Sequence, residues 1–103
     1  MISNKLHGAL PQDPYELGLR LLAADPGQAL VHWARAAALT PGNEELEFWR
    51  ATALASAGQR AEARRILQGV FQTGPGWRSL LLRLPAAGLL PDDPALLAEL
   101  LGT

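Results

Sequence analysis

The fold is decided by residues 44–77, which read EELEFWRATALASAGQRAEARRILQGVFQTGPGW. Asn43 precedes two glutamates, and a side chain that can cap a helix, followed by acidic residues, is typical of a helix start. Apolar residues recur at helical spacing on both sides of Gly58. Gly74-Pro75-Gly76 ends the pattern, because proline and glycine interrupt helices. The stretch therefore predicts two helices joined by a short turn.

Aspartate–proline pairs predict three further helix starts. An aspartate side chain accepts hydrogen bonds from the first backbone N–H groups of a helix, and a proline at the next position lacks an N–H that would have had no partner. These pairs are Asp13-Pro14, Asp25-Pro26 and Asp93-Pro94. A short helix that begins near Trp77 and ends at Pro85 brings the set to six. No alternating β-branched run indicates a strand, so the predicted fold class is all-α, with about six short antiparallel helices.

Each predicted helix has an apolar stripe that can face a core. In the first helix the stripe contains Tyr15, Leu19 and Leu22, and Leu17 and Leu21 widen it. The other five helices show the same spacing, as antiparallel packing requires. Their stripes contain Ala29, Trp33, Ala36 and Ala37; Leu46, Trp49, Ala53 and Ala57; Ala63, Ile66, Leu67 and Val70; Trp77, Leu80, Leu81 and Leu84; and Leu96, Leu97, Leu100 and Leu101.

The chain repeats itself at an interval of 34 residues. Pro41 and Pro75 are separated by that interval, and at the same offset Ala29 corresponds to Ala63. In period and residue type the chain resembles the tetratricopeptide repeat family. The resemblance implies two to three stacked helical hairpins and a protein partner.

Residues 44–77 fit this family best, because Ala51 stands where the family has a small residue that lets two helices approach. The first unit, residues 10–43, matches in its second helix, but Leu17 takes the small position in its first. Residues 78–103 form a truncated third unit. The stack is expected to be one domain over the whole chain, with a flexible segment at residues 1–12.

A second resemblance extends over most of the chain. It rests on the runs Glu44–Trp49, Ala57-Gly58, Pro75–Trp77, Arg83–Pro85 and Gly88–Pro91. Together these are similar to the C-terminal helical domain of uncharacterised bacterial Ntn-hydrolase-like proteins. This resemblance implies an accessory ligand-binding domain, for example for cell-wall glycan, that normally accompanies a separate enzyme domain. No catalytic residue carries over from that enzyme domain.

Composition limits the classes of function. The chain has 103 residues, 49% of them hydrophobic, a formal net charge of −1 and no cysteine. One small domain with a core is expected from this length and composition. Nucleic-acid binding is not expected, because it requires clustered positive charge. No apolar run is long enough to span a membrane, and a cytoplasmic protein is expected.

The sequence contains no recognisable catalytic or metal constellation. Its two histidines, His7 and His32, have no ligand at a spacing that would place two donors on one helical face. The adjacent carboxylates of Asp92-Asp93 and Glu44-Glu45 do not face a common point on a helix, and capping accounts for them. No catalytic residue, metal site or cofactor is therefore expected.

The tetratricopeptide resemblance places a partner-binding groove on the helix that begins at Glu44. The candidate residues are Glu45, Phe48, Trp49, Thr52 and Ser56. Phe48 and Trp49 project about 100° apart, so both rings can be buried only if that helix is covered on two sides. An exposed cluster of Phe48, Trp49 and Thr52 would suit a glycan, whereas an apolar groove would suit a helical partner.

Two other surfaces are candidates for contacts with partners. Arg60, Arg64 and Arg65 form either a solvated outer face mixed with Glu62 or a patch for an anionic partner. The leucines of residues 92–103 either fold back across the stack or form a dimer seam. The leading hypothesis is a non-catalytic protein-interaction or scaffold module, which recognises a partner segment or forms a homodimer through its leucine-rich ends. The accessory ligand-binding domain is the alternative.

Overall fold

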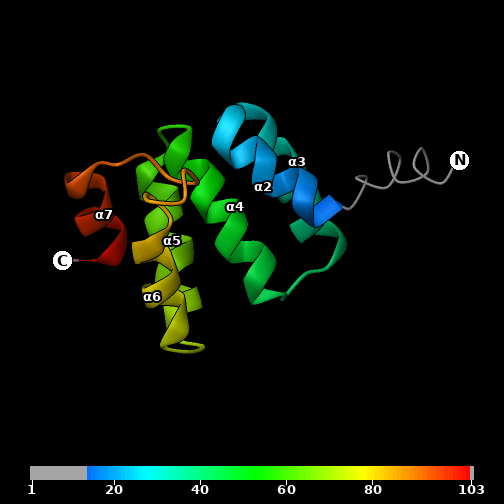
Figure 1. Ribbon diagram of the computed structural model, residues 1–103. Coiled ribbons are helices and arrows are strands. Elements are labelled where there is room, and N and C mark those ends of the chain that lie inside the picture. The colour runs from blue at the N-terminus through cyan, green and yellow to red at the C-terminus, as the bar shows by residue number, and fades with distance from the viewer. Residues whose placement is uncertain (1–13, 103) are drawn as a thin grey trace, which may run out of the picture.

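The computed structural model describes residues 14–102. All elements in that range are helices (Figure 1): α2 (Pro14–Ala24), α3 (Pro26–Leu39), α4 (Glu44–Ser56), α5 (Arg60–Phe71), α6 (Gly76–Arg83) and α7 (Pro94–Leu101). The predicted all-α class with six short helices is confirmed for this part of the chain. The segment 1–12, which was expected to be flexible, lies outside the described residues.

The helix starts follow the predicted caps. The Asp25 carboxylate accepts a hydrogen bond from the backbone N–H of Gln28 at 3.2 Å. The Asn43 side chain accepts one from the N–H of Leu46 at 3.0 Å, and Asp93 caps α7 in the same way. Each side chain satisfies an N–H that the first helical turn leaves without a partner. These three helix starts are therefore determined by local sequence. The remaining predicted cap, Asp13, lies outside the described residues.

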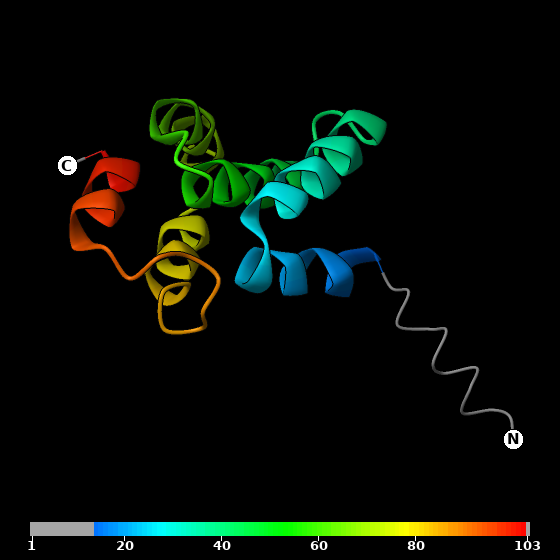
Figure 2. The same cartoon turned by 90° about the horizontal axis from the view of Figure 1, so that it is seen from above.

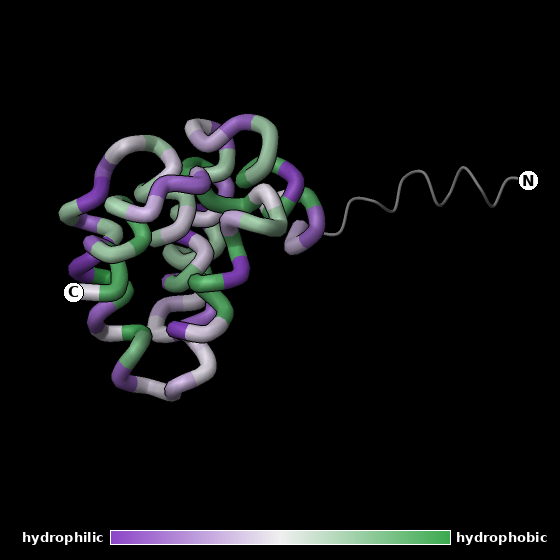
Figure 3. The backbone as a smooth tube through the Cα atoms, turned by 60° about the vertical axis from the view of Figure 1, so that its left-hand side comes forward, coloured by the Kyte–Doolittle hydropathy of each residue, from purple (hydrophilic) through white to green (hydrophobic). Residues whose placement is uncertain are grey.

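α4 lies at the centre of the stack. Figure 2 shows α3 and α5 on one side of α4 and α2 and α6 on the other. α2 with α3, and α4 with α5, form two successive hairpins, and α3 also packs on α4. α6 begins a third unit, while α7 packs on α5. Hydrophobic and hydrophilic stretches alternate along the helices (Figure 3), as expected where each helix is covered on part of its surface.

The aromatic rings of α4 are buried on two sides. The Trp49 ring stacks on Trp33 of α3 with ring centroids 6.0 Å apart. The Phe48 ring packs against the Trp77 ring of α6, with ring centroids 4.9 Å apart. Phe48 is completely buried and Trp49 is 5% exposed. The condition for burying consecutive rings is thus met, because helices cover α4 from both directions.

The first hairpin departs from the expected register. Leu17, predicted to widen the apolar stripe, is 42% exposed, whereas Gly18 is buried. A Cβ atom on Gly18 would lie 2.3 Å from the Trp33 side chain, and the Trp33 indole N–H donates to the Gly18 carbonyl at 3.2 Å. Only Asp25 separates α2 from α3, whereas three residues separate α4 from α5. The shorter turn shifts α2 along α3 relative to the arrangement of α4 and α5. Gly18, and not Leu17, therefore stands where the repeat family has the small residue that lets two helices approach.

α7 folds back across the stack. Leu96 and Leu100 are buried, and α7 packs on α5. Arg60 at the start of α5 pairs with Asp93 at 3.4 Å and with Glu99 at 3.3 Å. One of the two arrangements predicted for residues 92–103 is therefore confirmed, and the leucines Leu96 and Leu100 are covered within the chain.

Substitutions at two glycines test the close contact between α2 and α3. Gly18→Ala is expected to lower the free energy of unfolding by about 1–3 kcal/mol, because the added methyl group overlaps the Trp33 ring. Gly69→Ala in α5 is the matched control, because nothing lies within 4 Å of its Cβ position. It is expected to raise the free energy by up to about 1 kcal/mol through helix propensity. Urea denaturation followed by circular dichroism measures both, and equal effects would contradict the contact.

Deletion of residues 92–103 tests the role of α7. The truncated chain is expected to aggregate, because removing Leu96 and Leu100 uncovers the apolar face of α5. Light scattering across a concentration series measures this. Arg60→Gln is the control, because it removes the ion pairs to Asp93 and Glu99 but keeps α7. This variant should stay folded, since each surface ion pair adds at most about 1 kcal/mol to the free energy of unfolding. Unchanged solubility and helicity of the truncated chain would contradict the prediction.

Candidate partner-binding surfaces

The predicted groove on α4 is enclosed. Phe48 and Thr52 are completely buried, and Trp49 is almost so. The Thr52 hydroxyl donates a hydrogen bond to the Phe48 carbonyl within the same helix at 3.0 Å, which satisfies this polar group away from water. These three side chains therefore cannot contact a partner in this structure. Of the five predicted groove residues, Glu45 is exposed and Ser56 is half-buried.

The chain itself covers this inner face, which we define as the side of α4 that α2 and α6 cover. Trp77 of α6 lies against Phe48, and Leu84 and Leu90 of the following segment are buried. A pocket of about 200 Å³ remains where that segment meets Ser56 and the turn between α2 and α3. The Ser56 hydroxyl is buried there without a hydrogen-bond partner among the described residues. The inner face is thus filled by the chain's own helices and by residues 84–91, apart from this small opening.

Glu45 takes part in a hydrogen-bonded connection between α2 and α4. The Trp49 indole N–H donates to the Tyr15 hydroxyl at 2.8 Å, and that hydroxyl donates to the Glu45 carboxylate at 2.6 Å. Burial and the bond to Glu45 raise the pKa of Tyr15 to about 12, because the phenolate would lose solvation and lie beside a negative charge. The sequence indicated Tyr15 only as an apolar stripe residue. Its hydrogen bonds to Glu45 and Trp49 depend on how closely α2 approaches α4, and the sequence pattern does not predict that distance.

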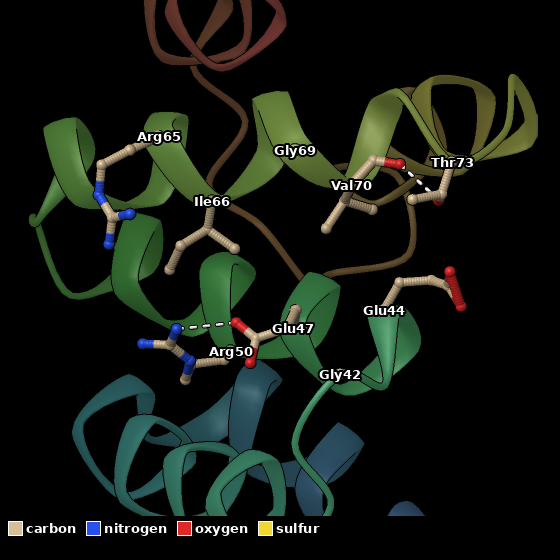
Figure 4. A pocket seen from close by; sticks show the side chains of 9 residues that line it. All are labelled: Gly42, Glu44, Glu47, Arg50, Arg65, Ile66, Gly69, Val70 and Thr73. Atoms are coloured by element: carbon tan, nitrogen blue, oxygen red, sulfur yellow. Dashed lines mark hydrogen bonds and ion pairs between the residues drawn. The ribbon is translucent and has the colours of Figure 1, made fainter.

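An open trough lies on the opposite side of α4. We define the outer trough as the depression between α3 and α5, which has α4 as its floor. Its larger hollow, about 360 Å³, is shown in Figure 4. A second hollow of about 280 Å³ adjoins it at Glu47 and Arg50, which line both. The larger hollow is lined by Gly42, Glu44, Glu47, Arg50, Arg65, Ile66, Gly69, Val70 and Thr73, and the second by Ala34, Ala37, Ala38, Glu47 and Arg50.

Ion pairs balance most charges beside the outer trough. Arg50 pairs with Glu47 at 2.7 Å. The Arg65 guanidinium binds Glu62, and this hydrogen bond is the main cause that lowers the pKa of the Glu62 carboxyl. The same bond raises the pKa of Arg65, and Glu47 adds to this through its charge. Acidic and basic side chains therefore alternate between α4 and α5 at this end of the trough.

The predicted anion patch is divided between two surfaces. Arg60 faces α7 and pairs with two carboxylates, Asp93 and Glu99. Arg65 faces the outer trough and binds Glu62. Arg64 makes no ion pair with any residue between 14 and 102. The three arginines therefore do not form one unbalanced basic cluster, because neighbouring positions on α5 meet different partners.

The described residues contain neither a cluster of metal-ligating side chains nor a membrane-spanning helix. Among residues 14–102, no three side chains of histidine, aspartate or glutamate gather as a metal site would require. The His32 ring donates a hydrogen bond from Nε2 to the Pro14 carbonyl at 2.8 Å and lies edge-on to Trp33. None of the helices within the described range has the length and apolar character needed to cross a bilayer.

Comparison with known proteins identifies one family. A family model described as tetratricopeptide repeat matches residues 20–87. The matched region begins inside α2 and runs to the end of α6, so it includes the hairpin of α4 and α5 and the three helices that form the outer trough, but only the last part of α2. No curated protein and no solved structure matches the chain.

Titration of Tyr15 tests the connection between α2 and α4. The chain has one tyrosine, so its phenolate absorbance reports this residue alone. We expect an apparent pKa of about 12 instead of the ordinary value of about 10. The contribution of Tyr15 to stability is then present below pH about 10 and is lost as the pH rises towards 12, because the unfolded chain releases the proton first. In Glu45→Gln this pKa should be lower, although burial still keeps it above 10. A pKa of about 10 for Tyr15 in the unmodified chain would contradict the hydrogen-bonded connection between α2 and α4.

Proposed function

The chain belongs to the tetratricopeptide repeat family, and we propose that it is a non-catalytic protein-interaction module that binds a segment of a partner protein. The observation that carries this proposal is the outer trough. It is open along α4 and combines the apolar side chains Ile66 and Val70 with charged ones. Its larger hollow is within the usual range of ligand sites, roughly 300–1,000 Å³. A single domain over residues 1–103 and a cytoplasmic location are part of the same proposal.

The filled inner face supports the choice of the outer trough. A partner on the inner face would have to displace Leu84 and Leu90, both of which are buried. Exposing a buried leucine costs about 1.5–3 kcal/mol, so displacement of two would oppose binding strongly. The outer trough needs no such rearrangement, because its hollows are already open to solvent.

Neither the accessory ligand-binding domain nor the homodimer is supported by an observation comparable to the outer trough. A glycan site requires accessible aromatic rings, and Phe48 and Trp49 are enclosed. The accessory ligand-binding domain therefore lacks the aromatic cluster on which it depended. A homodimer through the leucine-rich ends stays a prediction, although Leu96 and Leu100 are already buried against the stack.

Two measurements on the full chain test the proposed function. Light scattering should give the mass of a monomer, 11.0 kDa, across a concentration series. A library of random peptides displayed on phage should then yield sequences that bind the folded chain saturably, one peptide to one chain. Urea-unfolded protein is the control and should not bind them. If no peptide is enriched, or if enriched peptides bind the unfolded chain equally well, the interaction hypothesis is wrong. A stable dimer would favour self-association instead.

A further inference from the structure

Building on the proposed function, we infer that the outer trough receives an amphipathic helix of a partner protein. This helix places a lysine or arginine against Glu44 and an apolar side chain over Gly69. The two hollows of the trough adjoin at Glu47 and Arg50. An elongated element can lie along two adjoining hollows, whereas a compact small molecule would fill one of them, and a helix presents neighbouring side chains three or four positions apart on one face.

Gly69 is the first observation that supports a close approach. It lies within α5 and lines the larger hollow (Figure 4). Glycine is less stable than alanine inside a helix. Nothing within 4 Å would meet a Cβ atom at this position, so packing among residues 14–102 gives no reason for a missing side chain. The glycine leaves the α5 backbone open to the hollow, and such openness allows another backbone to come near.

The walls of the trough extend this opening. Ile66 and Val70 flank Gly69 on α5 and are 8% and 4% exposed, so they offer an apolar but shallow surface. Across the trough, α3 contributes Ala34 and Ala38, whose side chains are short. The short side chains of α3 on one wall, and the missing side chain at Gly69 on the other, let the ridge of an incoming helix approach the α4 floor.

Charge determines which partner fits. Each arginine that lines the larger hollow already has an acidic partner, because Arg50 pairs with Glu47 and Arg65 with Glu62. Glu44 lines the same hollow and makes no hydrogen bond or ion pair through its side chain with residues 14–102. Glu44 lies in the first turn of α4, where the helix dipole favours a carboxylate, but no cationic side chain among residues 14–102 pairs with it, so it offers a negative charge beside the apolar wall of the trough. A partner complements it with one cationic side chain next to an apolar one.

Three matched helical peptides test this inference. They share an alanine-rich sequence with one leucine, and one turn away they carry lysine, glutamine or glutamate. Fluorescence anisotropy should show that the lysine peptide binds the full chain about two- to fivefold more tightly than the glutamine peptide, and that the glutamate peptide binds most weakly. In Glu44→Gln the preference for lysine should disappear. If the wild-type chain binds all three peptides equally, or if Glu44→Gln keeps the preference, the assignment of Glu44 is wrong.

A second variant tests the position of the helix. Gly69→Leu should weaken binding of the lysine peptide about tenfold or more, because the new side chain fills the hollow. Gly76→Leu is the matched control, since its Cβ position is also free of neighbours but lies outside the trough. Circular dichroism should show that both variants stay folded. Unimpaired binding by Gly69→Leu would overturn the trough as the site.

The remaining outcomes separate this inference from the proposed function. If phage-selected peptides bind but Gly69→Leu does not affect them, the interaction function stands and the trough is not its site. If none of the three helical peptides binds the wild-type chain, the trough does not receive such a helix. If Gly69→Leu converts a dimer of the chain into a monomer, the occupant is a second copy and the inference of a separate partner is wrong.

Discussion

Two consecutive rings on α4 require neighbours in two directions, and the arrangement of the stack depends on this constraint. Phe48 and Trp49 project about 100° apart, so no single neighbouring helix can bury both. Trp33 covers one ring from α3 and Trp77 approaches the other from α6. Tyr15 then links α2 to the Trp49 indole through a hydrogen bond. α4 therefore becomes the central helix, and its position fixes which side of the molecule is filled and which stays open.

The sequence predicts what local chemistry controls. Asp25, Asn43 and Asp93 accept hydrogen bonds from N–H groups two or three residues away, so the helix starts could be inferred from residue order alone. The helical class and the apolar stripes follow from spacing in the same way. Gly18 was missed because its role depends on the length of the turn at Asp25, which shifts one helix against the next. A fixed repeat interval does not include such a shift.

The candidate site was less predictable than the fold. The resemblance to a repeat family indicated α4 as the partner-binding helix, but not that residues 84–91 would cover its inner side. Coverage of this kind depends on contacts between distant parts of the chain, and no periodic pattern encodes them. The arginines of α5 give a second example. Arg60 and Arg65 look equivalent in sequence, yet one meets α7 and the other meets Glu62 beside the trough.

The docking of α7 has a consequence for the order of folding. Most helix contacts join neighbours in sequence, from α2 with α3 to α5 with α6, and such local contacts close short loops at small entropic cost. The pairing of α5 with α7 omits α6 and brings Arg60 to Glu99, 39 residues away. This closure becomes favourable only after α5 has a surface on which Leu96 and Leu100 can pack. We therefore expect residues 94–101 to join a stack that has already formed, in keeping with their emergence from the ribosome after every helix that they cover.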